Sequence, residues 1–159
     1  MNKHAVHEQI IQRLRAELSL QAQAAQLARD EATDEESRAE NKWDTHSQEA
    51  AYLAEGQSRL VAEIGASILA YESLPLRDFA AGSAIDIGAL VEAGSGAVPN
   101  WYFIGPRSGG IEVEVDGQTV LVITPQSPLG RELLGKRTGE TIKAGAQGVH
   151  AGLRILSVA

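Results

Sequence analysis

A long stretch without helix-breaking residues opens the chain: residues 1–72 contain no proline, and their first glycine is Gly56. Apolar residues recur within it at alternating steps of three and four, which is the period of an amphipathic helix. One such pattern covers about residues 4–29 and a second covers about residues 36–71. Each apolar stripe is too narrow for a helix that is buried on all sides. Folding the two helices back on each other as an antiparallel coiled coil buries both stripes.

The expected seam of this hairpin changes in character along its length. Large aliphatic residues lie near its base, and alanines crowd its outer half, which predicts a slender outer end. About 27 residues at 1.5 Å per residue give a length of roughly 40 Å. The seam residues are Ile11, Leu14, Leu18, Ala25 and Ala28 in the first helix, and Trp43, His46, Ala50, Leu53, Gln57, Leu60, Ile64 and Ile68 in the second.

The connection between the two helices is strongly acidic. Six of the eleven residues from Asp30 to Glu40 are carboxylates, against the single base Arg38. One interpretation is structural: Thr33 caps the second helix, Glu36 completes a capping box, and the helix dipole favours the acids. The other is functional, because six carboxylates exceed what capping requires and a cation would ease their repulsion. Carboxylate oxygens with retained water molecules suit Mg²⁺.

The formal net charge of −7 lies mostly in the first half, where residues 1–72 carry 13 acids and 7 bases. Binding to a phosphate backbone needs clustered Lys and Arg, so we expect no independent sequence-specific DNA binding. Hydrophobic residues make up 43% of the chain, which supports a core, and the absence of Cys excludes disulfides. No stretch resembles a secretion signal or a membrane span, so the expected location is the cytoplasm, without membrane contact.

Residues 73–159 follow a different pattern. Pro75 ends the second helix, and a linker is expected over residues 73–81. Short alternating or apolar runs then predict strands, and Asp116-Gly117 predicts a hairpin turn. A small antiparallel sheet with one short helix makes residues 82–159 an α+β domain. The expected strands cover residues 84–91, 101–104, 111–115, 119–123 and 153–158.

A short helix is expected between the last two of these strands. Ser127 suits its N-cap, Pro128 its first position and Gly135 its end. Leu133 and Leu134 are expected to face the sheet. Each end of this helix therefore carries its own local signal.

Three cations near this helix, Arg131, Lys136 and Arg137, form a modest basic patch. Either the patch is a solvated face or it is a docking surface for an acidic or helical partner element. A histidine metal site is not expected, because His4 and His7 share one helix face without a third ligand nearby.

Three stretches of the chain resemble the bacterial Gre-type transcript cleavage factors, GreA and GreB. They are Glu40-Asn41 in the acidic connection, Glu55-Gly56-Gln57 in the second helix and, with most specificity, residues 127–140. The last stretch is similar to the family's Ser-Pro-x-x-x-x-Leu-x-Gly-Lys-x-x-Gly pattern. The similarity covers nearly the whole chain, with both parts in the family's order.

The resemblance implies an N-terminal coiled-coil hairpin over residues 1–72, with an acidic tip at about residues 30–41, and an FKBP-like C-terminal domain. It implies RNA polymerase as the partner, with the hairpin in the secondary channel and only indirect contact with nascent RNA. The polymerase then cleaves backtracked RNA with its own Mg²⁺. The chain would be an accessory factor and no enzyme itself, would bind no cofactor alone, and would associate with the bacterial nucleoid through the polymerase.

The resemblance also assigns roles to individual residues. Tip carboxylates would help hold Mg²⁺ in the complex with polymerase, an asparagine would hydrogen-bond locally at the tip, and the region of the short helix would dock. The tip residues are Asp34, Glu36, Glu40 and Asn41, and the docking residues are Ser127, Pro128, Arg131, Lys136 and Arg137.

The tip departs from the family pattern at one position. The family's Asp-x-x-Glu-Asn motif places an Asp three residues before the Glu, whereas this chain has Ser37 before Glu40. Asp34 or Glu36 would supply the missing carboxylate if the turn is longer. Two alternatives therefore stay open: a channel-occluding regulator without cleavage activity, and a coiled-coil interaction module unrelated to polymerase.

Overall fold

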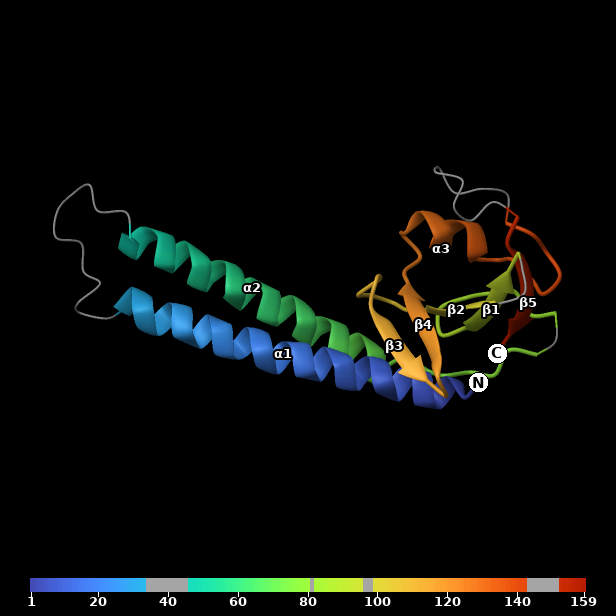
Figure 1. Cartoon of the computed structure of the whole chain (residues 1–159), viewed down its shortest axis with the longest axis horizontal. Coiled ribbons are helices and arrows are strands. Elements are labelled where there is room, and N and C mark those ends of the chain that lie inside the picture. The colour runs from blue at the N-terminus through green and yellow to red at the C-terminus, as the bar shows by residue number, and fades with distance from the viewer. Residues whose placement is uncertain (34–45, 81, 96–98, 143–151) are drawn as a thin grey trace. The chain divides into compact units, whose positions relative to one another are not determined.

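The computed structural model describes residues 1–33, 46–80, 82–95, 99–142 and 152–159. It divides the chain into two compact units. The hairpin unit is Arg13–Ile68, and the sheet unit combines Met1–Gln12 with Leu69–Ala159. The expected α+β class is confirmed, with long N-terminal helices followed by a sheet and one short helix (Figure 1).

Two helices supply the hairpin unit: α1 (Lys3–Thr33) with its residues from Arg13 onward, and α2 (His46–Glu72) with its residues up to Ile68. Leu14, Ala25 and Ala28 of α1 are buried there, at the spacing that the sequence predicted. The Arg29 guanidinium donates a hydrogen bond to the Ser58 hydroxyl at 2.7 Å, which joins the two helices directly. The antiparallel pairing of the helices within this unit is visible in Figure 1.

The seam of α2 differs from the prediction. Ile64 and Ile68 are buried as expected, but Leu53 and Leu60 are exposed at 54% and 36%. Apolar residues occupy both position 60 and position 61, so the sequence fits two neighbouring rows of the helix. Packing selects the row that contains the partly buried Val61.

The helix boundary at Thr33 also differs from the prediction. Thr33 is the last residue of α1, so it does not cap the second helix. Residues 34–45, which include the rest of the expected acidic tip, lie outside the described residues.

The sheet unit contains five strands in the order β3-β4-β2-β1-β5. Their bounds are β1 Leu90–Gly94, β2 Asn100–Ile104, β3 Glu112–Val115, β4 Gln118–Ile123 and β5 Arg154–Val158. All neighbours are antiparallel except β2 and β4, which run parallel. The expectation of a wholly antiparallel sheet is therefore wrong for this one pair. The cause is the position of β3 at the edge of the sheet. The chain passes from β2 to this edge, turns back after β3, and so brings β4 beside β2 in the same direction as β2.

One turn between strands lies where the sequence predicted it, and a second turn replaces part of an expected strand. Asp116 and Gly117 both have positive φ, 54° and 72°, and join β3 to β4 in the expected tight hairpin. The expected strand at residues 84–91 is irregular up to Ala89, with a turn at Ile87 and Gly88, and β1 begins only at Leu90. Gly88 has a φ of 87°, and the Asp86 carboxylate accepts a hydrogen bond from the Ile87 N–H at 2.8 Å. This local turn overrides the apolar run.

Both faces of the sheet are covered within the sheet unit. Helix α3 (Pro128–Leu133) lies over one face (Figure 1), where Leu133 joins Tyr102 and Ile104 in one buried cluster. On the other face, the rings of Tyr71 and Phe103 lie 6.4 Å apart between centroids. The end of α2 therefore packs on the sheet and belongs to the core of this unit.

Candidate functional site

Helix α3 is fixed at its start by its own side chains. Ser127 is the N-cap, and its hydroxyl accepts from the Gly130 N–H at 3.0 Å and donates to the Thr124 carbonyl at 2.8 Å. Pro128 occupies the first turn, where the missing N–H costs no helix bond. At the other end, the Leu134 N–H donates to the Gly130 carbonyl at 2.9 Å. The cap, proline and sheet-facing Leu133 are all confirmed as predicted.

Gly130 is needed for a close approach that the sequence did not reveal. A Cβ at this position would lie 2.0 Å from the Thr124 carbonyl oxygen and 2.9 Å from the Ser127 hydroxyl oxygen. Atoms this close would force the helix away from the end of β4. The glycine therefore holds the first turn of α3 against the strand that precedes it.

An open, mostly apolar cavity of about 410 Å³ lies beside the start of α3. Its walls come from the end of β4, the loop before β3 and the first residues of α3. Two of the expected docking residues, Ser127 and Pro128, line it together with the neighbouring Leu129. The complete lining is Gly109, Gly110, Leu121, Val122, Ile123, Thr124, Ser127, Pro128 and Leu129. Sequence reasoning did not place Gly109 and Gly110 at this site, because their loop comes beside β4 only in the folded sheet, where the Gly110 N–H donates to the Val122 carbonyl at 2.8 Å.

The three cations of the expected basic patch have different surroundings. Lys136 pairs with Glu140 at 3.2 Å, and the Arg137 N–H donates to the same carboxylate at 2.7 Å. The hydrogen bond from Lys136, followed by that from the Arg137 N–H, lowers the pKa of Glu140. The Arg137 guanidinium also donates to the Gly82 carbonyl. Lys136 and Arg137 thus hold their own loop together, and Arg137 also joins it to the segment before β1.

Arg131 differs from these two cations. It is exposed in the last turn of α3, and within the described parts of the chain its guanidinium has no polar partner. Its charge contributes nothing visible to the fold. Of the three cations, Arg131 is therefore the one whose charge is available to another molecule.

The predicted tip residues are not placed by this structure. Asp34, Glu36, Glu40 and Asn41 lie outside the described residues. Nearby, the Gln26 amide donates to the Asp30 carboxylate at 2.7 Å on α1. Within the described residues, no group of three or more His, Asp or Glu side chains is arranged to hold a metal ion. The roles of the tip remain predictions.

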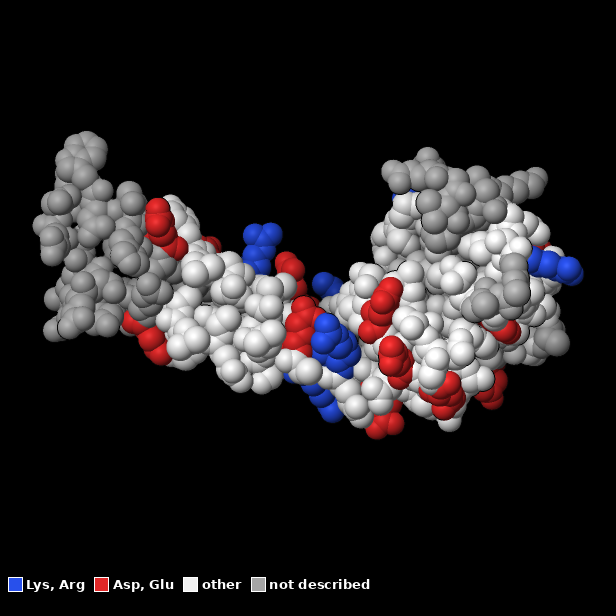
Figure 2. Space-filling model, viewed as in Figure 1, with Lys and Arg blue, Asp and Glu red and all other residues white. Residues whose placement is uncertain are grey.

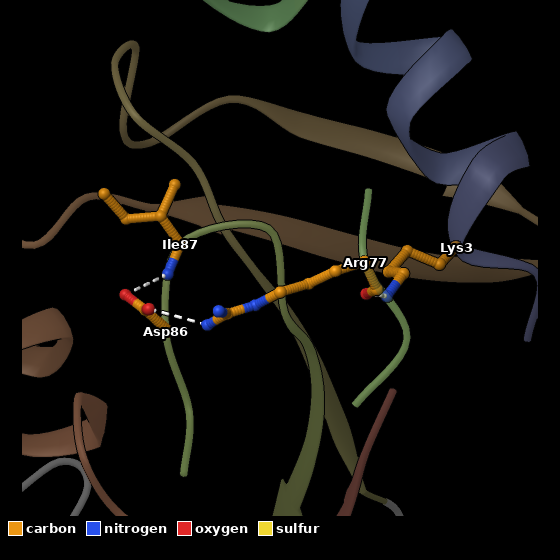
Figure 3. A network of polar contacts seen from close by, with 4 residues as sticks. All are labelled: Lys3, Arg77, Asp86 and Ile87. Atoms are coloured by element: carbon orange, nitrogen blue, oxygen red, sulfur yellow. Dashed lines mark hydrogen bonds and ion pairs between the residues drawn. The ribbon is translucent and has the colours of Figure 1, made fainter. Parts of the chain in front are cut away.

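A polar network pins the linker to the start of α1 within the sheet unit, and sequence reasoning missed it (Figure 3). The buried Lys3 ammonium donates to the Arg77 carbonyl at 2.6 Å and lies 4.9 Å from the centroid of the Phe79 ring. Arg77 lies over the same ring and forms an ion pair with Asp86 at 2.6 Å. Burial lowers the pKa of the Lys3 ammonium.

Tyr71 makes a second contact that no sequence pattern indicated. Its hydroxyl donates to the Arg107 carbonyl at 2.9 Å, and a Cβ on Gly105 would meet this hydroxyl at 2.0 Å. The His7 ring lies 2.9 Å from the Tyr71 carbonyl oxygen. Burial raises the pKa of the Tyr71 phenol. These residues are far apart in the sequence, so only the fold brings them together.

The described helices include none that is long and apolar enough to cross a membrane. No family model matches the sequence, and no curated protein matches it closely. Among solved structures, the chain is similar to the GreA factor homolog 1 (Gfh1) protein of Thermus thermophilus, with 19% identity and a TM-score of 0.38 over 98% of this chain and 93% of that chain. Gfh1 of Thermus aquaticus is 20% identical, with a TM-score of 0.36 over 92% of both chains. Another structure of the transcription factor Gfh1 is 16% identical, with a TM-score of 0.39. A likeness at this level leaves function to be argued from the residues.

Proposed function

We propose that this chain is a Gre-like transcription elongation factor that binds RNA polymerase through the α3 region and inserts its hairpin into the secondary channel. The observation that carries the proposal is that some residues of the stretch 127–140 stabilise the fold and one exposed residue does not. Ser127 and Gly130 have roles inside the fold, whereas Arg131 has none that its surroundings reveal. An exposed cation on a helix that also borders an apolar cavity suits an acidic, apolar element of a partner.

The second part of the proposal concerns the acidic connection. Residues 30–40 carry six carboxylates, from the last residues of α1 into the segment that connects it to α2. In the complex, Asp34, Glu36 and Glu40 would approach the catalytic centre, where their oxygens suit Mg²⁺. The ion would supply Lewis-acid stabilisation of the hydrolysed phosphate. Asn41 would hydrogen-bond locally to keep these carboxylates in position.

A second candidate function is favoured by one residue. Ser37 stands where the family pattern has an Asp, so the tip offers one carboxylate fewer at the expected position. A factor with such a tip would occupy the channel and slow elongation without stimulating cleavage. Both candidates require the same binding to polymerase and differ only in what the tip does there.

The test adds the purified protein to a stalled, backtracked elongation complex and follows the RNA length. Shortening of the RNA supports the cleavage factor, and slowed elongation without shortening supports the occluding regulator. An Asp34→Ala, Glu40→Ala double variant should lose cleavage while it still binds polymerase. If the wild-type protein fails to co-purify with polymerase at moderate salt, the chain is a coiled-coil module with another target.

A further inference from the structure

The hairpin unit exposes more large apolar side chains than its own pairing accounts for. Leu27 is 70% exposed and Tyr52 is 75% exposed, although both lie on long helices that bury a separate seam. Exposed apolar residues are ordinary when scattered singly, but contiguous patches indicate binding sites. The exposed set on this unit is Leu20, Leu27, Tyr52, Leu53 and Leu60.

Four of these residues share one face of the hairpin. Leu20 and Leu27 are seven residues apart on α1, and Leu53 and Leu60 are seven apart on α2, so each pair forms a row along its helix. Leu27 comes one position before the buried Ala28, and Leu60 comes one position before the partly buried Val61. Leu20 and Leu53 continue the same two rows. Because the helices are antiparallel, residues one position before the seam point to the same side on both helices.

The register of the two helices brings the rows together. Arg29 of α1 bonds to Ser58 of α2, so these residues lie at the same level along the hairpin. Leu27 is two positions from Arg29, and Leu60 is two positions from Ser58. Because α1 and α2 run in opposite directions, residues before Arg29 on α1 and residues after Ser58 on α2 both lie nearer the base of the hairpin. Leu27 and Leu60 are therefore neighbours across the two helices.

Gly56 forms a recess in this surface. It lies three residues after Leu53 and four before Leu60, and nothing lies within 4 Å of a Cβ built on it. A glycine in a helix interior costs about 1 kcal/mol relative to alanine. Internal packing does not require that cost here, because the space is open. A small residue ringed by larger ones is the hole that receives a side chain from another helix.

The charges bordering this face indicate the chemistry of its partner. Among the described residues, Glu17, Glu49 and Glu63 also come one position before a seam residue, against the one base Arg13. The Glu63 carboxylate forms an ion pair with the Arg59 guanidinium, at 3.6 Å between Oε1 and Nε. On the side drawn in Figure 2, charged side chains lie at the outer end of the described hairpin and again toward its base, with uncharged surface between them. A second copy of this chain, with its net charge of −7, would meet like charges.

We propose that this face, formed by Leu20, Leu27, Leu53, Gly56 and Leu60, receives an apolar helix bordered by Lys or Arg on the binding partner. The contact makes a three-helix layer, with a partner side chain seated at Gly56. For the identity of the partner, the proposal rests on the proposed function, so the helix belongs to RNA polymerase. The side of the hairpin, as well as its end, then fixes the hairpin in the complex.

The test measures the affinity of polymerase for wild-type protein and four variants. Leu27→Glu and Leu60→Glu place a charge in the apolar rows and should each raise Kd at least about tenfold. Ala62→Glu is the matched control, because Ala62 is exposed on α2 and lies two positions after Leu60, away from the face. Its Kd should stay within about twofold of wild type, as expected for a surface change outside an interface.

Gly56→Leu separates shape from polarity and guards against misfolding of the charged variants. It keeps the face apolar and suits a helix better than glycine, yet it fills the recess, so Kd should rise while helix content by circular dichroism is retained. Wild-type binding with unchanged Kd in all variants would overturn this inference and leave the proposed function standing. Absence of wild-type binding would overturn both. Wild-type dimers that Leu27→Glu dissociates would show the face to be a self-association surface, which overturns the inference.

Discussion

At the scale of single residues, two glycines in different environments make opposite predictions. A Gly130→Ala methyl group would lie 2.0 Å from the Thr124 carbonyl oxygen, whereas nothing lies within 4 Å of a Cβ on Gly65 of α2. We expect Gly130→Ala to lower the free energy of unfolding by about 1–3 kcal/mol through overpacking. Gly65→Ala should raise it by up to about 1 kcal/mol through helix propensity. Urea titrations followed by circular dichroism measure both, and equal effects would contradict the packing at Thr124.

Tyr71 predicts a pH dependence of stability. Its pKa is raised by burial above the ordinary value of 10.0, so above that pH the unfolded chain loses the phenolic proton before the native protein does. The contribution of Tyr71 is therefore complete below pH 10 and is lost as pH rises beyond it.

Tyr71→Phe tests this linkage. At pH 7 the variant should be less stable by about 1 kcal/mol, because the hydrogen bond to the Arg107 carbonyl is lost. The difference should shrink above pH 10, because there the unfolded wild type is stabilised by losing a phenolic proton that the native wild type keeps, and the variant has no such proton. Tyr52→Phe is the control, since Tyr52 is 75% exposed. A gap between wild type and Tyr71→Phe that stays constant to pH 11 would exclude a raised pKa.

At the scale of elements, the sequence predicts what local chemistry decides. The Ser127 cap, the Pro128 start and the Asp116-Gly117 turn each depend on residues within four positions, and all three are present as predicted. The parallel pairing of β2 with β4 is different, because it joins strands separated by β3 and two turns. No residue at either strand marks its partner. The prediction of a strand before Leu90 was wrong for a local reason, since the side chain of Asp86 and the glycine at position 88 form a turn there.

The seam of the hairpin lies between these two cases. Helical periodicity predicted two amphipathic helices, and their existence is confirmed. It could not choose between the row through Leu60 and the row through Val61, because both are apolar and the two rows are adjacent. That choice depends on the partner helix, and it decides which leucines remain exposed. The exposed face is therefore a product of packing that periodicity alone does not reveal.

The α3 region yields a prediction about docking. Arg131→Ala removes an exposed cation that has no polar partner in the described structure, so stability should change by less than about 0.5 kcal/mol. If Arg131 meets a carboxylate of polymerase, Kd should rise about tenfold, as for a charge-assisted hydrogen bond. Lys136→Ala is an informative contrast, because it breaks the ion pair with Glu140 and should act mainly on the local loop. Unchanged affinity in Arg131→Ala would remove this helix from the proposed interface.

At the scale of the whole molecule, the chain joins two units through continuous helices. Met1–Gln12 packs with Leu69–Ala159, so α1 begins in the sheet unit and continues into the hairpin unit. Lys3 secures this start by its bond to the Arg77 carbonyl. The sequence could not predict that contact, since 74 positions separate its two residues. The carboxylates of the acidic connection, in contrast, can be identified from the sequence alone, and substitutions among them test the proposed function directly.

Ser37→Asp restores the carboxylate that the family pattern places three residues before Glu40. If the tip acts by presenting carboxylate oxygens to Mg²⁺, polymerase should cleave backtracked RNA at least about tenfold faster with this variant than with the wild-type protein, because one further ligand oxygen favours the bound ion. Ala39→Asp adds the same charge two positions away and should leave the rate near that of wild type. RNA shortening in stalled elongation complexes gives both rates. An equal gain in both variants would mean that net charge, and not the position of the carboxylate, governs the response, whereas no gain in either would assign the hairpin to channel occlusion.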